Sequence, residues 1–78
     1  MNKKLINLIS KVMNIPPEEI NDESGPLNIE NWTSFNSYVL LSELEKEFNQ
    51  KFTMEEAMDV KNVADIKRHL QNHGIQFD

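Results

Sequence analysis

The sequence contains no cysteine among its 78 residues. The chain can therefore form neither a disulfide nor a thiolate metal site, an absence that is typical of proteins in a reducing compartment. No apolar run approaches the roughly 20 residues that a membrane-spanning helix needs. The apolar stretch after the Met-Asn-Lys-Lys start is short and is interrupted by Asn7, Ser10 and Lys11, which argues against a signal peptide. We expect a cytoplasmic protein.

The sequence also lacks internal repeats and strand-like alternation of apolar and polar residues. Its length fits one domain at most, so we expect residues 1–78 to form a single domain. Only 38% of the residues are hydrophobic, which permits a core but hardly an enclosed catalytic cavity. We therefore expect a monomeric binding or carrying module rather than an enzyme.

The net charge of −5 is distributed unevenly along the chain. Eleven acidic residues and two lysines lie between Glu18 and Asp59, a local balance of −9, whereas the remaining residues carry +4. An acidic surface of this kind repels phosphate backbones, which argues against a nucleic-acid partner. It would instead attract and orient proteins that have basic docking surfaces, unless the acidic residues serve only solubility.

A first helix is predicted by apolar residues at Leu5, Leu8, Ile9 and Val12, and it should end near Asn14, ahead of two prolines. Residues 17–19 could form one short turn with Ile20 pointing inward. A connection from about Asn21 to Trp32 follows, and loops of this length are often functional. Three of its apolar residues are expected to anchor it to the core. They are Leu27, Ile29 and Trp32.

The second helix has the strongest pattern, because Leu40, Leu44 and Phe48 recur every four residues. Leu41 lies beside this stripe and Phe35 a turn earlier. Thr33 is a suitable N-cap, since its hydroxyl can accept a hydrogen bond from an amide of the first turn, and this places Ser34 at the first helical position. Fraying is expected around residues 49–50.

Two shorter helices are predicted after residue 52. Thr53 and Glu56 have the spacing of a capping box, which predicts a helix to about Met58, with Phe52 as the apolar residue before the cap. Asn62 should cap a last helix over residues 63–72, whose apolar face is Val63, Ile66 and Leu70 and which Gly74 ends. The predicted fold class is all-α. It is a small bundle of three main helices and one short helix, with a long loop between the first two.

The order of these elements and the residues around Ser34 resemble the acyl carrier protein family. The resemblance runs from the first helix to Leu70. In the family an Asp-Ser-Leu triplet opens the second helix, and a Leu-Glu-x-x-Phe stretch lies ten residues beyond its serine. Here Thr33-Ser34-Phe35 stands at the triplet and Leu44-Glu45-Lys46-Glu47-Phe48 at the stretch. The segment 15–20 also looks like the family's sequence after its first helix.

The resemblance implies that Ser34 is the attachment point of a covalent 4′-phosphopantetheine arm derived from coenzyme A. Such an arm supplies the thiol that this sequence lacks. The implied partners are a phosphopantetheinyl transferase and acyl-transferring or acyl-activating enzymes with basic docking surfaces. The implied docking residues flank Ser34 or lie on the second and third helices. They are Thr33, Phe35, Glu43, Glu47, Glu55 and Glu56.

Three positions depart from the family pattern. Thr33 replaces the aspartate, and Asn36 and Val39 stand where many members have acidic residues. These replacements suggest a discrete carrier for a fatty acid-related or specialised pathway, such as polyketide, lipopeptide or glycan acylation. A peptidyl or aminoacyl carrier, and an unmodified interaction module of the same fold, remain open alternatives.

Other chemistry-bearing residues have simpler interpretations. His69 and His73 lie four residues apart, a spacing that can bind a metal, but no third ligand is evident, and the helix dipole favours histidine there in any case. Nothing in the spacing of Ser, His and Asp indicates a hydrolase triad. Ser37 and Ser42 are predicted to face solvent, with Ser37 as the fallback attachment site. Two aromatic residues flank Ser34, and anchoring in the core or the loop is the expected role of both, with contact to a carried cargo as the alternative. They are Trp32 and Tyr38.

Overall fold

A computed structural model of the chain describes residues 3–76. In this range four α-helices and one short 3₁₀ turn occur, and no strand is formed. The predicted all-α fold is therefore confirmed. The elements are α1 (Lys3–Met13), η1 (Pro17–Glu19), α2 (Ser34–Phe48), α3 (Met54–Asp59) and α4 (Val63–Asn72).

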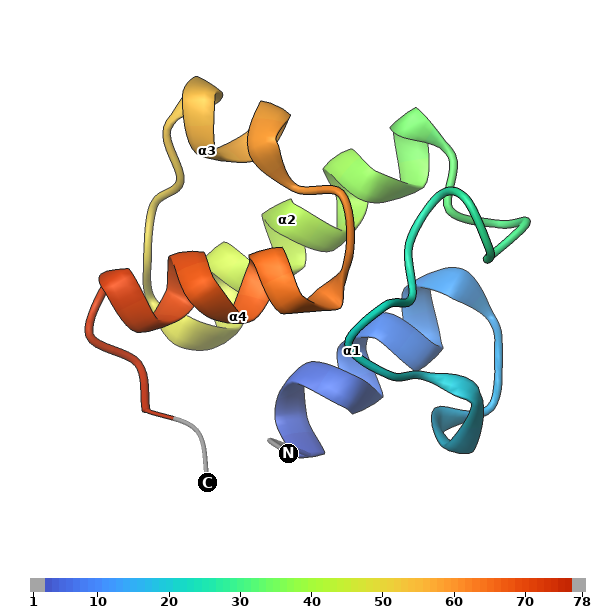
Figure 1. Cartoon of the computed structure of the whole chain (residues 1–78). Coiled ribbons are helices and arrows are strands. Elements are labelled where there is room, and N and C mark those ends of the chain that lie inside the picture. The colour runs from blue at the N-terminus through green and yellow to red at the C-terminus, as the bar shows by residue number, and fades with distance from the viewer. Residues whose placement is uncertain (1–2, 77–78) are drawn as a thin grey trace.

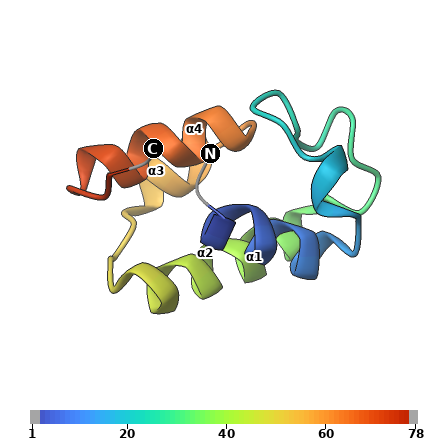
Figure 2. The same ribbon diagram turned by 90° about the horizontal axis from the view of Figure 1, so that it is seen from below.

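The core lies between α1, α2 and α4. Helices α1 and α2 pack against each other, and α3 and α4 lie over them (Figures 1 and 2). The loop over residues 20–33 closes one end of the bundle and contributes three buried apolar side chains. Helix α3 contributes none. The buried apolar residues are Leu5, Ile9, Met13, Ile20, Ile29, Trp32, Leu40, Leu44, Val63, Ile66 and Leu70.

Asparagines end both long helices. Asn14 follows α1 with φ 57°, and Asn49 follows α2 with φ 53°. This left-handed conformation is tolerated by asparagine better than by most residues, and it turns the chain out of the helix. The next amide then bonds back into each helix, from Ile15 to the Ser10 carbonyl at 3.2 Å and from Gln50 to the Glu45 carbonyl at 3.0 Å. The predicted ends of these helices are confirmed.

The long loop is tied to the beginning of α4. The amides of Val63 and Ala64 donate to the carbonyls of Ser24 and Asp22, at 2.9 and 3.0 Å. A Cβ atom at Gly25 would collide with the carbonyl oxygen of Lys61, so only glycine allows the two backbones to approach this closely. These contacts fix one side of the loop that leads into α2.

Two of the predicted anchors are wrong. Leu27 is fully exposed, because the turn over residues 25–28 points its side chain into solvent, and Tyr38 is 72% exposed on α2. The other anchors, Ile29 and Trp32, are buried as predicted. Phe35 also lies outside the core, at 72% exposure, although it continues the apolar stripe of the sequence. Among the described residues, no helix has the length and apolar character that a membrane span requires.

Candidate functional site

Ser34 is exposed and occupies the first position of α2. Thr33 caps the helix as predicted, because its Oγ1 accepts a hydrogen bond from the Asn36 amide at 3.1 Å. The Ser37 amide donates to the Thr33 carbonyl at 2.8 Å, which is the first bond of the helix. The amides of Ser34 and Phe35 therefore have no acceptor among the described residues.

Two asparagines hold the turn that presents Ser34. The Nδ2 of Asn31 donates to the Met13 carbonyl at the end of α1, at 2.8 Å. The Nδ2 of Asn36 donates to the Asn31 carbonyl at 2.8 Å, and the Thr33 amide donates to the same carbonyl at 2.9 Å. Nothing in the sequence pattern predicts these positioning roles. An acidic side chain at position 36 would lack the donor that makes this bond.

A hollow of about 380 Å³ lies beside Ser34 and is named the attachment hollow. It separates the start of α2 from the loop and α3. Ser37, the fallback site, also borders it, but both Ser37 and Ser42 are half-buried rather than solvent-facing as predicted. No residue of this lining is a titratable base. The lining consists of Pro26, Trp32, Thr33, Ser34, Ser37, Ala57, Met58 and Val60.

A second hollow of about 290 Å³ continues between α2 and α3 and is named the apolar hollow. It shares Ala57 with the attachment hollow, so the two are neighbours. Most of its lining surface comes from aliphatic, aromatic and thioether groups, which favour the burial of an apolar ligand chain. Its lining is Tyr38, Leu41, Ser42, Glu45, Phe52, Thr53, Met54 and Ala57.

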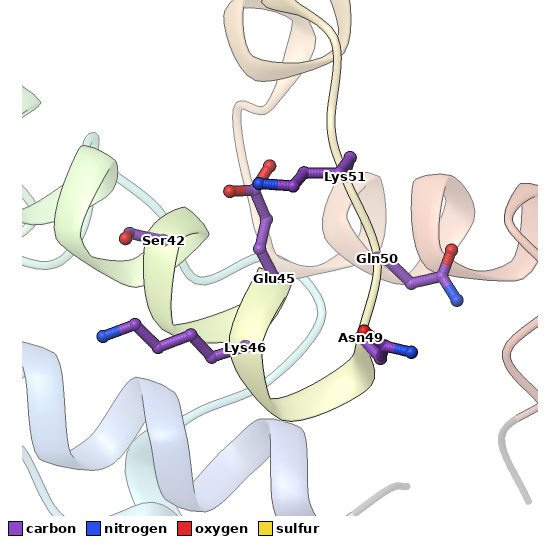
Figure 3. Close-up of a pocket in the computed structure, with 6 residues that line it drawn as sticks. All are labelled: Ser42, Glu45, Lys46, Asn49, Gln50 and Lys51. Atoms are coloured by element: carbon purple, nitrogen blue, oxygen red, sulfur yellow. The ribbon is translucent and has the colours of Figure 1, made fainter.

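The opposite end of α2 carries a third, polar hollow of about 320 Å³ (Figure 3). Two of its members are already engaged elsewhere. Glu45 Oε2 accepts a bond from the Phe52 amide at 2.8 Å, and Gln50 Oε1 lies 3.3 Å from His73 Nδ1. This hollow is a feature of the α2–α3 connection and lies away from Ser34. Its lining is Ser42, Glu45, Lys46, Asn49, Gln50 and Lys51.

The four glutamates predicted to dock partners differ in how far their carboxylates are engaged in contacts within the molecule. Glu43 pairs with Lys46 at 3.4 Å and Glu47 with Lys4 at 3.4 Å, both as exposed ion pairs that contribute little to stability. Glu55 is exposed on α3. Glu56 is engaged inside the molecule, so its carboxylate is the least free of the four to meet a partner.

Glu56 joins α3 to α4. Its Oε1 accepts from the Thr53 amide at 2.9 Å, and the Thr53 hydroxyl accepts from the Glu56 amide at 3.1 Å, which confirms the predicted capping box. Its Oε2 lies 2.7 Å from His73 Nε2 and 3.6 Å from His69 Nδ1. Because α3 has no buried residue, such polar contacts hold it in place.

The two histidines belong to this α3–α4 connection. His69 is buried, and its Nε2 lies 3.0 Å from Asp59 Oδ2, whereas the ring of His73 meets that of Phe52 at 5.5 Å. Within residues 3–76 no three metal-ligating side chains gather at one point. The main feature of His69 is therefore its pairing with a carboxylate from another helix, which the helix dipole alone does not predict.

The same contacts lower the pKa values of two carboxyl groups. The hydrogen bond from the Thr53 amide lowers the pKa of Glu56 from its usual 4.5, and the bond to His73 adds to this effect. A hydrogen bond from Arg68 lowers the pKa of Asp59 from its usual 3.8, followed by the bond to His69. Both carboxylates are therefore more acidic in the folded protein than in the unfolded chain.

The lowered pKa values predict that acid weakens the α3–α4 connection. The unfolded chain binds more protons than the folded protein as the pH falls, so the free energy of unfolding should decrease from about pH 4.5 downward. Glu56→Gln keeps the capping-box acceptor but loses the charge, so it should reduce stability at neutral pH by about 1 kcal/mol and flatten this acid dependence. Urea unfolding followed by circular dichroism across the pH range measures both effects. Parallel pH profiles for parent and variant would contradict the assignment.

Comparison with known proteins identifies the family. The sequence pattern of the family described as "Phosphopantetheine attachment site" matches residues 3–70, so the chain belongs to this family. The chain is also 28% identical over 74 residues to a protein named "Acyl carrier protein" from Azobacteroides pseudotrichonymphae genomovar. CFP2. This alignment covers 94% of the chain and 87% of that relative. The chain is therefore a phosphopantetheine-binding acyl carrier protein, not an enzyme, and its prosthetic group is 4′-phosphopantetheine.

The residues of the site fit this group. An exposed serine hydroxyl lies at the beginning of α2, next to two amides that have no acceptor and at the positive end of the helix dipole. A phosphodiester on that hydroxyl would be stabilised by both features. The apolar hollow between α2 and α3 would accommodate an apolar cargo.

Proposed function

We propose that Ser34 is the residue that bears 4′-phosphopantetheine and that the chain is a discrete acyl carrier of a specialised pathway. The assignment of the arm to Ser34 is supported most directly by the exposed position of this residue at the start of a capped helix. The bound arm supplies a thiol that holds an acyl group as a thioester.

Loading requires one bond to form and one to break. The Ser34 Oγ bonds to the phosphorus that bears pantetheine in coenzyme A, and the pyrophosphate P–O bond breaks so that adenosine 3′,5′-bisphosphate leaves. The hydroxyl proton needs an acceptor. Because the lining of the attachment hollow contains no titratable base, we expect the transferase to supply it.

The proposal of a specialised pathway rests on the helix start. Neither Thr33 nor Asn36 nor Val39 carries a charge, whereas carriers of this family often have acidic residues there. Transferases and acyl-handling enzymes that depend on those charges would bind this helix start weakly. The apolar lining between α2 and α3 favours an acyl cargo over a charged aminoacyl cargo.

Intact-mass spectrometry tests the proposal. The protein is incubated with coenzyme A and each of several broad-range phosphopantetheinyl transferases, with a general fatty acid carrier as a parallel positive control. We expect a gain of one phosphopantetheinyl group per chain. No gain with any transferase that loads the control would favour an unmodified interaction module of the same fold.

Thr33→Asp is expected to quicken loading by a transferase adapted to ordinary fatty acid carriers. An aspartate at position 33 can accept the hydrogen bond from the Asn36 amide as Thr33 does. The free energy of unfolding should therefore change by no more than about 1 kcal/mol. Loading rates of both forms with a general transferase measure the effect, and Thr33→Ser provides an uncharged control that retains the cap. Equal rates for Thr33→Asp and the parent would remove the main support for specialisation.

A further inference from the structure

Trp32 is the one tryptophan of the chain, and its side chain meets two different environments. The ring belongs to the buried core and is only 3% exposed. It also forms part of the wall of the attachment hollow, together with Ser34 and Met58. Among the buried apolar residues of the described chain, Trp32 alone borders this hollow. It therefore connects the core to the surroundings of the attachment serine.

The indole N–H of Trp32 is a hydrogen-bond donor without an acceptor. Nε1 is buried, and no atom of residues 3–76 lies in position to accept its proton. In this range it is the only buried side-chain nitrogen or oxygen that has no partner. Such a donor destabilises the fold, because it has lost its hydrogen bond to water and has gained none within the protein. A buried donor beside a ligand hollow indicates that a ligand supplies the acceptor.

The phosphopantetheine arm carries two kinds of acceptor, a charged phosphodiester and, beyond it, two neutral amide groups. The amides of Ser34 and Phe35 lack an acceptor at the start of α2, and they stabilise the phosphodiester there. A charged group also costs far more to bury beside the indole than a neutral amide does. The amide carbonyls are therefore the acceptors that match the buried donor.

The wall of the attachment hollow can yield to admit such a group. On the α3 side this wall consists of Ala57, Met58 and, directly after the helix, Val60. Helix α3 contributes no buried side chain, and Met58 is unbranched and 76% exposed. A flexible side chain of this kind moves aside at little cost. An arm in the hollow can therefore reach the indole N–H without disruption of the core.

We propose that the indole N–H of Trp32 is a binding site for the loaded arm and donates a hydrogen bond to an amide carbonyl of its pantetheine portion. This assignment rests on the proposed function, because it takes Ser34 as the attachment point. The bond forms only after loading. Trp32 then directs the arm along the attachment hollow toward α3, while the phosphodiester remains at the start of α2.

The single tryptophan makes the donor directly observable. Nitrogen–proton correlation spectra contain one indole signal, which is compared before and after loading with coenzyme A and a transferase, with attachment verified by intact mass. On loading, the indole proton signal should move downfield, and its exchange with solvent should slow roughly fivefold to tenfold. A chain prepared with a phosphate on Ser34 and no pantetheine should keep the signal and the exchange rate of the unloaded chain.

Removal of the donor provides a second, independent measurement. Trp32→Phe retains an aromatic ring but has no N–H, so thermal unfolding of its loaded and unloaded forms isolates the bond to the arm. Loading should raise the melting temperature of the parent, and this gain should be smaller by roughly 4–8 °C in Trp32→Phe. Tyr38→Phe is the matched control. It removes a hydroxyl from an exposed ring of α2 outside the attachment hollow, so it should keep the parent's gain.

The outcomes separate this assignment from the proposed function. An unchanged indole signal on a chain whose mass shows a loaded Ser34 would overturn the role of Trp32 and leave the proposed function intact. An equal shift with phosphate alone would make the phosphodiester the acceptor and would overturn the assignment to an amide. Equal gains in melting temperature for the parent and Trp32→Phe would also contradict it. If Trp32→Phe does not fold, the indole signal of the parent still decides.

A failure of loading would have a different meaning. If no transferase that loads a control carrier attaches an arm to this chain, the proposed function itself fails, and the role of Trp32 fails with it.

Discussion

Replacing Ser34 with alanine is expected to abolish covalent loading of the chain completely. The substitution removes the Oγ that bonds to phosphorus, and no other hydroxyl in residues 3–76 combines exposure with the first position of a capped helix. Ser34 is exposed and its side chain makes no hydrogen bond to the rest of the described chain, so the fold should be unaffected. Intact-mass spectrometry after incubation with coenzyme A and an active transferase measures the loss.

Ser37→Ala is the matched control for this prediction. Ser37 borders the same hollow but is half-buried and lies one turn into the helix, so its variant should load like the parent. Circular dichroism should show unchanged helix content for both variants. A phosphopantetheinyl group on Ser34→Ala would show that a different residue is the attachment point.

Trp32→Ala is expected to cause the largest loss of stability. The side chain is only 3% exposed, lies immediately before the cap of α2 and joins the long loop to the core. Truncation of a buried tryptophan removes about 3–5 kcal/mol from the free energy of unfolding, which is a large share of the stability of so small a domain. The variant should also lose the fixed presentation of Ser34, so loading should slow.

Two further variants make this prediction specific. Leu27→Ala removes an apolar side chain from the same loop, but Leu27 is fully exposed and the change should stay within about 0.5 kcal/mol. Trp32→Phe should cost less than Trp32→Ala, because the buried indole N–H has no acceptor among the described residues and its removal breaks no hydrogen bond there. Urea unfolding followed by circular dichroism measures the free energy of unfolding of all three variants. A small effect of Trp32→Ala would mean that the loop is not anchored through this residue.

The helix boundaries could be predicted from the sequence because their determinants are local. The caps at Thr33, Thr53 and Asn62 each accept a bond from an amide three residues later, so the residue types and their spacing suffice. The core residues of α4 followed from helical periodicity in the same way. In α1 the predicted stripe is right for Leu5 and Ile9, whereas Leu8 and Val12 are only half-buried and Met13 is the third core residue. The position of Ser34 at the first turn of α2 is a consequence of the Thr33 cap.

Features that depend on distant contacts could not be predicted. Periodicity has no meaning in an irregular loop, so nothing in the sequence distinguished the exposed Leu27 from the buried Ile29. The exposure of Tyr38 depends on where α3 lies relative to α2. The pairing of His69 with Asp59 requires α3 and α4 to be side by side, and an expectation based on the helix dipole alone does not include it.

Quantification of thiols is the most direct test of the central claim that Ser34 carries the arm. The chain contains no cysteine, so a thiol reagent can react only with a bound arm. The purified protein should show no thiol before loading, one thiol per chain after incubation with coenzyme A and an active transferase and removal of free coenzyme A, and none when Ser34→Ala is treated identically. Absence of a thiol in the treated parent, while a control carrier gains one, would contradict the account, as would a full thiol on Ser34→Ala.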